Sequence, residues 1–293
     1  MKQTHSPVLL KISTVFLVVV LTAASGPCVY GQKINAKKMI EEMIAGRRTQ
    51  TLIPALTETY GSFSVKRAYQ IQRQLARELS KELGALAGYK VAYASKAAQK
   101  QFGMTEPARG PLFRLQRVPN GSKLPVDTFR EMTLETEIAF TIGKWIDHEF
   151  ENVAQIKNHV RWVHTAFDAG DYRFKADAAP KVQDQIASGV GAHVFVLGPA
   201  VCPSQVDVDA LRLKLIRNGQ VLADSPATDV MGSPWNSLLW CANHVVKLGG
   251  TLEPGAVVVT GTAAPAYRAK GDGIKGDYIG DCGPLGKVTM TLD

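Results

Sequence analysis

Cysteine is scarce in this sequence of 293 residues, which contains only four. No two of them have the C-x-x-C spacing that is typical of zinc sites and redox motifs. Three lie beyond residue 31 (Cys202, Cys241 and Cys282), and three isolated cysteines do not predict a disulfide. Cys241 lies in an apolar helical segment, so we expect it to be a buried and unreactive thiol.

Two common catalytic motifs are missing as well. The sequence contains neither a glycine-rich phosphate loop nor the G-x-S-x-G elbow of serine hydrolases. No internal repeat is visible. Nucleotide hydrolysis and serine hydrolase chemistry are therefore unsupported.

The charge pattern argues against a nucleic-acid partner. The formal net charge is +8, but the basic residues are scattered among acidic neighbours. No zinc-finger spacing, basic stripe or RNA-binding aromatic run accompanies them. We interpret the excess positive charge as an attraction for small anions and an aid to solubility.

The apolar run near the N-terminus is too short to span a bilayer, which takes about 20 residues. Residues 12–24 are almost wholly apolar, follow a weakly basic start and lead into small residues, which is the order typical of a secretory signal. An uncleaved anchor is the alternative. We expect a signal peptide over residues 1–31, because Val29 and Gly31 fit the small-residue rule for cleavage. The mature chain would then be exported to the periplasm, with no membrane attachment.

Helical periodicity dominates the start of the mature chain. From Asn35 to about Leu86, apolar residues recur at helical spacing, with a break at Pro54 and Gly61. We assign residues 32–87 to an N-terminal helical region.

Beyond Gly88 the sequence changes to short β-like runs separated by glycine and proline. The predicted strands are 89–93, 134–142, 193–197, 211–216, 256–260 and 286–292. Two helical segments interrupt them, near Val153 to Thr165 and near Ser233 to Leu248. Helices followed by a strand-rich body predict an α+β fold, with residues 88–293 as the catalytic domain.

A pair of glutamates is the strongest chemical signal. In a strand, Glu135 and Glu137 share one face at a spacing of roughly 6.6 Å, so both can reach one cation. Ligation by oxygen alone suits a hard ion such as Mg²⁺ or Mn²⁺. The alternative is the wet face of an amphipathic strand.

Two further charged residues could belong to the same site. Asp168 follows a helix-like run, where it could be a third carboxylate ligand or a helix cap. Lys90 lies inside an apolar run and must be paired or reach solvent. Beside a carboxylate site it could hold an anionic substrate; alternatively it protects an edge strand from aggregation. We expect His164 to be a structural histidine rather than a ligand.

The order of short motifs along the chain resembles one known family. The motifs that carry the resemblance are Ala68-Tyr69-Gln70-Ile71-Gln72, Gly88-Tyr89-Lys90-Val91, Gly110-Pro111-Leu112-Phe113, Glu135-Thr136-Glu137-Ile138-Ala139, Ala166-Phe167-Asp168, Gly232-Ser233-Pro234-Trp235-Asn236, Val259-Thr260-Gly261 and Gly276-Asp277. In order and spacing they resemble the 2-keto-4-pentenoate hydratase family of the fumarylacetoacetate hydrolase superfamily, over roughly residues 38–293.

The resemblance implies a mixed β-roll body that holds Mg²⁺ or Mn²⁺. The positions that match the family's metal ligands are Glu135, Glu137 and Asp168, the last being Asp where the hydratases typically have Glu. Lys90 matches the family's catalytic lysine, and Thr260-Gly261 matches a segment that lines the carboxylate end of the substrate. The resemblance also implies a homo-oligomer, a small 2-oxo acid as substrate and a role in the breakdown of aromatic compounds.

Several reactions are compatible with such a site. The resemblance favours a hydro-lyase that adds water to a 2-hydroxydienoic acid. Acylpyruvate hydrolysis, 2-oxo acid decarboxylation and metal-dependent binding without turnover are the alternatives.

Three features depart from the family's pattern. The polar stretch expected before residue 193 is replaced by Ala187-Ser188-Gly189-Val190-Gly191, and the loop over residues 263–275 is longer than usual. Arg114 stands where an acidic residue is usual. We therefore expect Arg114 to bind a second substrate carboxylate, unless it is simply exposed.

Overall fold

The computed structural model describes Met1 and residues 35–262 and 264–293. The predicted signal peptide lies outside the described residues, apart from Met1. None of the described helices is long and apolar enough to cross a membrane. Residues 35–293 form one compact unit, so the N-terminal helices and the strand-rich body fold together.

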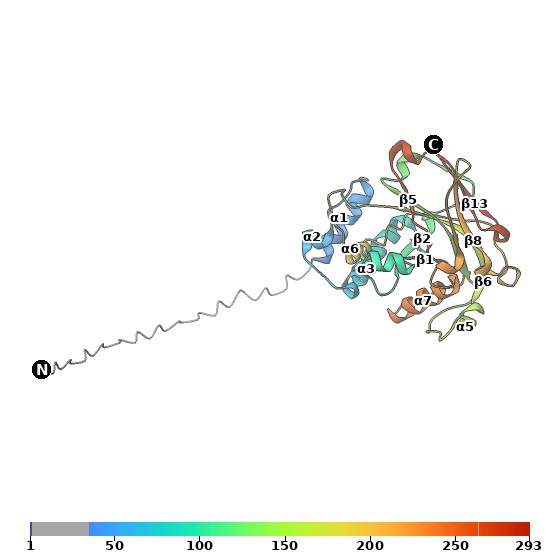
Figure 1. Ribbon diagram of the computed structural model, residues 1–293, viewed down its shortest axis with the longest axis horizontal. Coiled ribbons are helices and arrows are strands. Elements are labelled where there is room, and N and C mark those ends of the chain that lie inside the picture. The colour runs from blue at the N-terminus through green and yellow to red at the C-terminus, as the bar shows by residue number, and fades with distance from the viewer. Residues whose placement is uncertain (2–34, 263) are drawn as a thin grey trace. The chain divides into compact units, whose positions relative to one another are not determined.

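Among the described residues, three helices precede the first strand: α1 (Ala36–Arg48), α2 (Leu56–Tyr60) and α3 (Val65–Leu83). The periodicity predicted helices in this region, but the short helix α2 lies in the predicted break between Pro54 and Gly61. The side chain of Ser64 accepts a hydrogen bond from the backbone N–H of Arg67 and caps α3. The buried side of α3 includes Ala68, Ile71, Leu75 and Leu79, and the helix contacts α6 (Val182–Ala187). The helical region is therefore part of the wall of the body rather than a free appendage (Figure 1).

The body contains two sheets. The larger has the strand order β2-β1-β10-β5-β6-β7-β3, and β11 pairs with β5 beside this path. Its strands are β1 (Leu86–Ala92), β2 (Ala108–Phe113), β3 (Arg117–Val118), β5 (Met132–Ile142), β6 (Val160–Asp171), β7 (Val194–Leu197), β10 (Val257–Val259) and β11 (Tyr267–Ala269).

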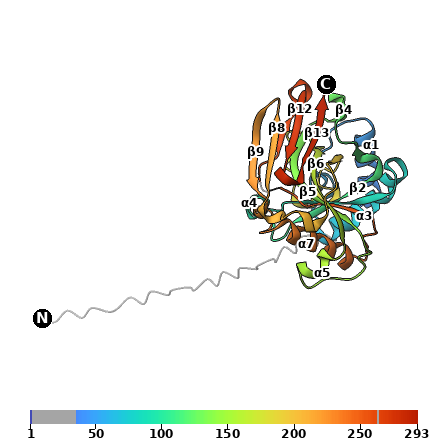
Figure 2. The same cartoon turned by 90° about the vertical axis from the view of Figure 1, so that its right-hand side faces the viewer.

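The smaller sheet has the order β4-β13-β12-β8-β9, and its strands lie side by side in Figure 2. Its strands are β4 (Ser122–Leu124), β8 (Arg212–Arg217), β9 (Gln220–Pro226), β12 (Gly276–Asp281) and β13 (Lys287–Leu292). A core that includes Leu134, Phe167, Tyr278 and Met290 is built from strands of both sheets. This packing buries one face of the long strands β5 and β6.

Two of the remaining helices pack against each other, and one of them packs against strands of the larger sheet. A second core forms where α7 (Pro234–Lys247) and α5 (Val153–Lys157) pack together. It includes Phe140 of β5, whose ring lies 4.3 Å from the ring of Trp235 on α7. The helix not yet mentioned, α4 (Lys96–Gln101), follows β1. Single 3₁₀ turns occupy Arg114–Gln116, Val126–Thr128, Pro203–Gln205, Val208–Ala210, Ala227–Asp229, Gly271–Ile274 and Gly283–Leu285.

The α+β class is confirmed, and one predicted helix is wrong. Only Val153–Lys157 of the segment 153–165 is helical, and the strand β6 begins at Val160. Most residues from 160 to 167 are β-branched or aromatic, and these side chains fit a strand packed on both faces. Asp168 therefore lies on a strand, not after a helix.

Candidate metal centre and its pocket

Three carboxylates converge on two neighbouring strands. Glu135 and Glu137 alternate with the buried residues Leu134, Thr136 and Ile138 along β5. Glu135 is directly opposite Asp168 on the antiparallel strand β6. One carboxylate oxygen from each of the three residues lies within 4.8 Å of the other two. The structure thus brings together the three residues that the sequence predicted as ligands.

Burial makes this cluster unstable without a counter-charge. Glu137 and Asp168 are 0% and 1% exposed. One oxygen of Glu137 accepts a hydrogen bond from the backbone N–H of Gly261. Its other oxygen, Oε1, and Oδ1 of Asp168 have no hydrogen-bond partner among the described residues. Buried carboxylate oxygens without partners are strongly unfavourable, and a cation between the strands would satisfy them.

Lys90 supplies part of the missing positive charge. Its Nζ forms an ion pair with Oδ2 of Asp168, and both side chains are buried. Burial alone would lower the pKa of Lys90, but Asp168, Glu135 and Glu137 outweigh it and hold that pKa above its usual value. When all four groups are ionised, three carboxylates and one ammonium leave two negative charges, which is the charge that a divalent cation neutralises.

The carboxylate pKa values reflect the same imbalance. Burial raises the pKa of Glu135 to about 7, although Lys90 opposes the rise. Burial also raises the pKa of Glu137 well above its usual range, and the charges of Asp168 and Glu135 add to the effect. A bound divalent cation would reverse these shifts. The donor set consists of oxygen atoms alone, which suits Mg²⁺ or Mn²⁺ better than zinc.

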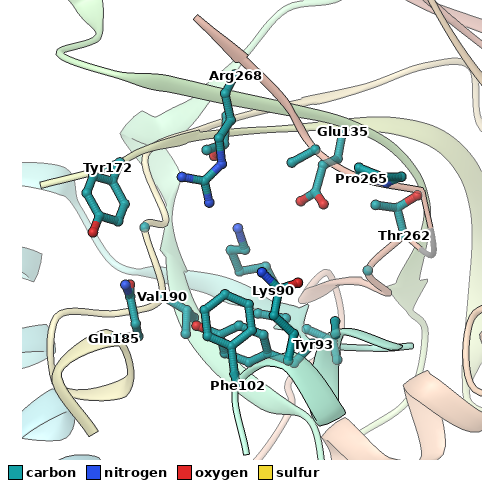
Figure 3. A pocket seen from close by; sticks show the side chains of 18 of the residues that line it. Lys90, Tyr93, Phe102, Glu135, Tyr172, Gln185, Val190, Thr262, Pro265 and Arg268 are labelled. Carbon is teal, nitrogen blue, oxygen red and sulfur yellow. The ribbon is translucent and has the colours of Figure 1, made fainter. Parts of the chain in front are cut away.

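A pocket of about 740 Å³ opens beside the carboxylate cluster, and Glu135 and Lys90 line it. Figure 3 shows Lys90, Glu135 and Arg268 directed toward its centre, with Tyr93 and Phe102 at one side and Tyr172 at the other. The guanidinium carbon of Arg268 lies 5.6 Å from the ring centre of Tyr172, and its Nη1 lies 3.9 Å from the carboxylate of Glu131. The pocket therefore has a negative floor and a basic wall.

Arg268 was not predicted as a site residue. The loop over residues 263–275 was noted as unusually long, but its contribution to the pocket depends on the short strand β11. Arg268 pairs there with Thr133 of β5, two residues before Glu135. This pairing places Arg268 at the mouth of the site, and no local sequence pattern predicts the pairing.

Arg114 does not line the pocket, contrary to the prediction that it binds a substrate carboxylate. It is exposed in the 3₁₀ turn after β2, beside Gly84. In the pairing of β1 with β2, Lys90 is opposite Gly110. Arg114 is four residues further along, roughly 13 Å away at the rise of an extended strand. Arg268 provides the basic group that Arg114 was expected to provide.

Thr260 and Gly261 have different roles, although they are neighbours in the chain. Gly261 lines the pocket and donates its N–H to Glu137, with φ at +85°. Thr260 is fully buried, and its hydroxyl donates to the carbonyl of Ile138 at 2.9 Å. Thr260 therefore holds β10 against β5 and does not line the pocket. The expectation that it contacts substrate is corrected by this hydrogen bond.

Two further sequence interpretations agree with the structure. Both ring nitrogens of His164 have partners, Thr141 Oγ1 at 2.9 Å and the Gly198 carbonyl at 3.1 Å, so it is a structural histidine. Cys202, Cys241 and Cys282 are free, and burial raises the pKa of Cys241 to about 12. None of these residues contributes to the carboxylate cluster.

Comparisons with known proteins agree on one family. The sequence model described as "Fumarylacetoacetate (FAA) hydrolase C-terminal" matches residues 87–290. The 2-keto-4-pentenoate hydratase of Burkholderia vietnamiensis is 29% identical over 258 residues, which are 88% of this chain and 95% of that protein. The 2-oxo-hept-4-ene-1,7-dioate hydratase of Escherichia coli is 28% identical over 244 residues, or 81% of this chain and 90% of that protein.

A solved structure with the same fold is 4-oxalocrotonate decarboxylase from Pseudomonas putida G7, complexed with magnesium and adipate. It superposes with a TM-score of 0.81 at 19% identity, and the match covers 88% of this chain and 97% of that chain. This likeness shows that the two chains share the fold over most of their length.

Proposed function

We propose that this protein, which belongs to the fumarylacetoacetate hydrolase family, is a divalent-metal-dependent hydro-lyase. The proposal rests on the family membership and on the geometry of the site. Its substrate would be a small 2-hydroxydienoic acid, the enol form of a 2-oxo acid such as 2-keto-4-pentenoate. The observation that carries the proposal is the buried cluster of Glu135, Glu137 and Asp168 beside Lys90. The hydratase names of the relatives support the same reaction.

The site residues would have different roles in this reaction. Glu135, Glu137 and Asp168 would hold Mg²⁺ or Mn²⁺, which as a Lewis acid supplies stabilisation of negative charge on the substrate's oxygens. Lys90 forms an ion pair with Asp168 and adds a positive charge beside the carboxylates, where an anionic substrate arrives. The side chains of Tyr93 and Phe102 form an apolar wall that limits the access of water from one side.

Arg268 favours substrates with a second carboxylate. It is the arginine that Figure 3 shows directed into the pocket from the wall opposite Lys90. A carboxylate at the far end of a dienoic acid could accept two hydrogen bonds from its guanidinium. A relative that acts on a dioate, according to its name, supports this extension. We therefore include 2-hydroxydienedioic acids in the proposed substrate class.

We also propose that the chain is exported, because its first residues have the order of a secretory signal. Expressing the full chain in a bacterium and sequencing the N-terminus of the periplasmic product tests this. Recovery of uncleaved chain from the cytoplasm would contradict it. A homo-oligomer remains a proposal that sedimentation of the same preparation tests.

The reaction itself is tested by product analysis. The full chain with Mn²⁺ or Mg²⁺ is incubated with 2-hydroxypenta-2,4-dienoate, and the conjugated ultraviolet absorbance is followed. The proposal expects metal-dependent loss of this absorbance and a product that has gained one water. Release of CO₂ from an oxalocrotonate, or carbon–carbon cleavage of an acylpyruvate, would instead identify the decarboxylase or hydrolase alternative. Metal-dependent binding of oxalate without any turnover would identify a binding protein.

A further inference from the structure

A second pocket lies on the other face of β1 from the carboxylate cluster. It has a volume of about 420 Å³ and is bordered by α3, β1, β2 and the end of α7. Neighbouring residues of a strand face opposite sides. Lys90 accordingly lines the first pocket, while Tyr89 lines the second. One strand therefore separates the two cavities.

Arg109 is the buried charged residue of this second pocket, with an exposed fraction of 7%. Its guanidinium carbon lies 4.4 Å from the ring centre of Tyr89 and 5.4 Å from that of Tyr69. Its Nε donates a hydrogen bond to Nδ1 of His244 at 3.0 Å. Burial lowers the pKa of His244 to about 4, and the charges of Arg109 and Lys247 add to this, so the imidazole is a neutral acceptor. These contacts orient the guanidinium without neutralising its charge.

The charged side chains in the described lining of the pocket are arginines. Arg73 and Arg77 line it from successive turns of α3, and none of its three arginines forms an ion pair with a carboxylate of the described residues. Asp and Glu are also absent from its described lining. A buried guanidinium with no anionic partner is unfavourable. The pocket is therefore built to attract a negative charge.

We propose that this pocket binds a small organic anion, consisting of a carboxylate or phosphate on a compact apolar group. The arginines offer paired N–H donors that match an oxyanion. The remaining lining includes apolar and aromatic side chains that match an apolar body: Leu86, Phe113, Val245 and Leu248. The proposal is independent of the metal-dependent reaction, because neither the carboxylate cluster nor its pocket contributes to this site.

The test is a calorimetric titration of the full chain, loaded with Mn²⁺, with benzoate and with phenyl phosphate. The neutral amide benzamide is the uncharged probe of the same size. We expect at least one of the two anions to bind and benzamide not to bind. The tighter of the two anions assigns the site to carboxylates or to phosphates.

The site is located with two matched double variants on α3. In Arg73→Gln/Arg77→Gln, which changes side chains at the rim, we expect the anion to bind at least about tenfold more weakly, the effect of losing one charge-assisted hydrogen bond. In Lys66→Gln/Arg67→Gln, which removes the same charge from the same helix outside the pocket, the affinity should stay within about twofold. Both variants leave Arg109 and its packing in place.

Three outcomes would overturn the proposal. The first is that neither anion binds the wild-type chain. The second is that both double variants bind with the same affinity, which would place the anion elsewhere, including the metal pocket. The third is a change in sedimentation of Arg73→Gln/Arg77→Gln with no change in anion affinity, which would make this surface a contact between copies of the chain.

Discussion

Lys90 and Asp168 form an ion pair in which the side chains are only 5% and 1% exposed. Removing one member of such a pair leaves an uncompensated buried charge, which typically costs 3 to about 5 kcal/mol. The same pair borders the proposed metal position, so Lys90 has both a structural and an electrostatic role. These two roles can be separated by adding the metal.

We predict that Lys90→Met destabilises the metal-free protein by about 3 to 5 kcal/mol. Methionine fills a similar volume but leaves Asp168 without its partner. Mn²⁺ should restore more stability to this variant than to the wild type, because the cation takes over the neutralisation of Asp168. Chemical denaturation with and without Mn²⁺ measures both effects. Lys96→Met, at an exposed position on α4, should change little; equal stability of wild type and Lys90→Met would contradict the account.

A second prediction at the residue scale concerns Arg268. Arg268→Met should lower kcat/KM for 2-hydroxyhepta-2,4-diene-1,7-dioate by about 10- to 100-fold, the loss expected for hydrogen bonds to a charged group. For the monocarboxylate 2-hydroxypenta-2,4-dienoate, the loss should be below about threefold, because no distal carboxylate is present. Lys270→Met, at an exposed position in the same loop, is the matched control. The same loss for both substrates would rule out Arg268 as the distal carboxylate's partner.

The site residues differ in how far the sequence could predict them. Glu135 and Glu137 follow from the two-residue repeat of a strand. Arg268 could not be predicted, because its position depends on β11 pairing with β5, more than a hundred residues earlier in the chain. Arg114 was predicted from its place in the family's motif and from the chemistry of its side chain, and the register of β1 and β2 directs it away from the pocket.

At the scale of elements, the wrong helix at residues 153–165 and the position of Asp168 have the same cause. A fully buried strand has no alternation of apolar and polar residues, so its sequence resembles that of a buried helix. From Val163 to Asp171 every residue of β6 is buried. The enrichment in β-branched and aromatic residues was the signal that could have distinguished the two.

The parallel pairing of β1 with β10 positions Lys90 and depends on one glycine. Gly88 has φ at +145°, and a Cβ added there would lie 1.8 Å from the carbonyl oxygen of Val257. We predict that Gly88→Ala separates the two strands, displaces Lys90 from Asp168 and weakens Mn²⁺ binding. Thermal unfolding and metal titration of the variant measure the two consequences.

Gly103→Ala is the control for this prediction. Gly103 also has a positive φ, +64°, but nothing lies within 4 Å of an added Cβ. The loss of stability in Gly103→Ala should be limited to the backbone penalty of about 1 to 2 kcal/mol, and its affinity for Mn²⁺ should be unchanged. If Gly88→Ala behaved in the same way, the close approach of β1 and β10 would not be what positions Lys90.

At the scale of the whole molecule, the α+β class and most strands could be predicted from local patterns of apolar, glycine and proline residues. The strand order did not, because β10 joins β1 to β5 across more than a hundred residues of intervening chain. The division into two sheets likewise depends on long-range packing, such as the buried cluster that contains both Phe167 of β6 and Tyr278 of β12. Local patterns carry no information about such partners.

The fold should respond to acid through its partly buried histidines. Burial lowers the pKa of His193 to about 4, and the charge of Arg173 contributes. The neutral ring donates to the Thr128 carbonyl at 2.8 Å. Because the folded-state pKa lies below the unfolded value of about 6.5, the stability due to neutral His193 is present above pH 6.5 and is lost as the pH falls toward 4.

We therefore predict that His193→Gln destabilises the protein more at pH 7.5 than at pH 4.5, by a difference on the order of 1 kcal/mol. Urea denaturation of wild type and variant at both pH values measures it, and taking the difference between the two proteins removes the titration of the metal-site carboxylates. His148→Gln, at an exposed histidine, should give a smaller difference. A pH-independent effect of His193→Gln would contradict the assignment of a neutral buried ring.

The most direct test of the central claim is a calorimetric titration of Mn²⁺ into the metal-stripped full chain, with oxalate present to complete the coordination. The account predicts one Mn²⁺ per chain, retained in Glu131→Gln, whose carboxylate lies outside the cluster, and abolished in Glu135→Gln/Glu137→Gln. The absence of binding by the wild type, or undiminished binding by the double variant, would show that the three carboxylates are not a metal centre.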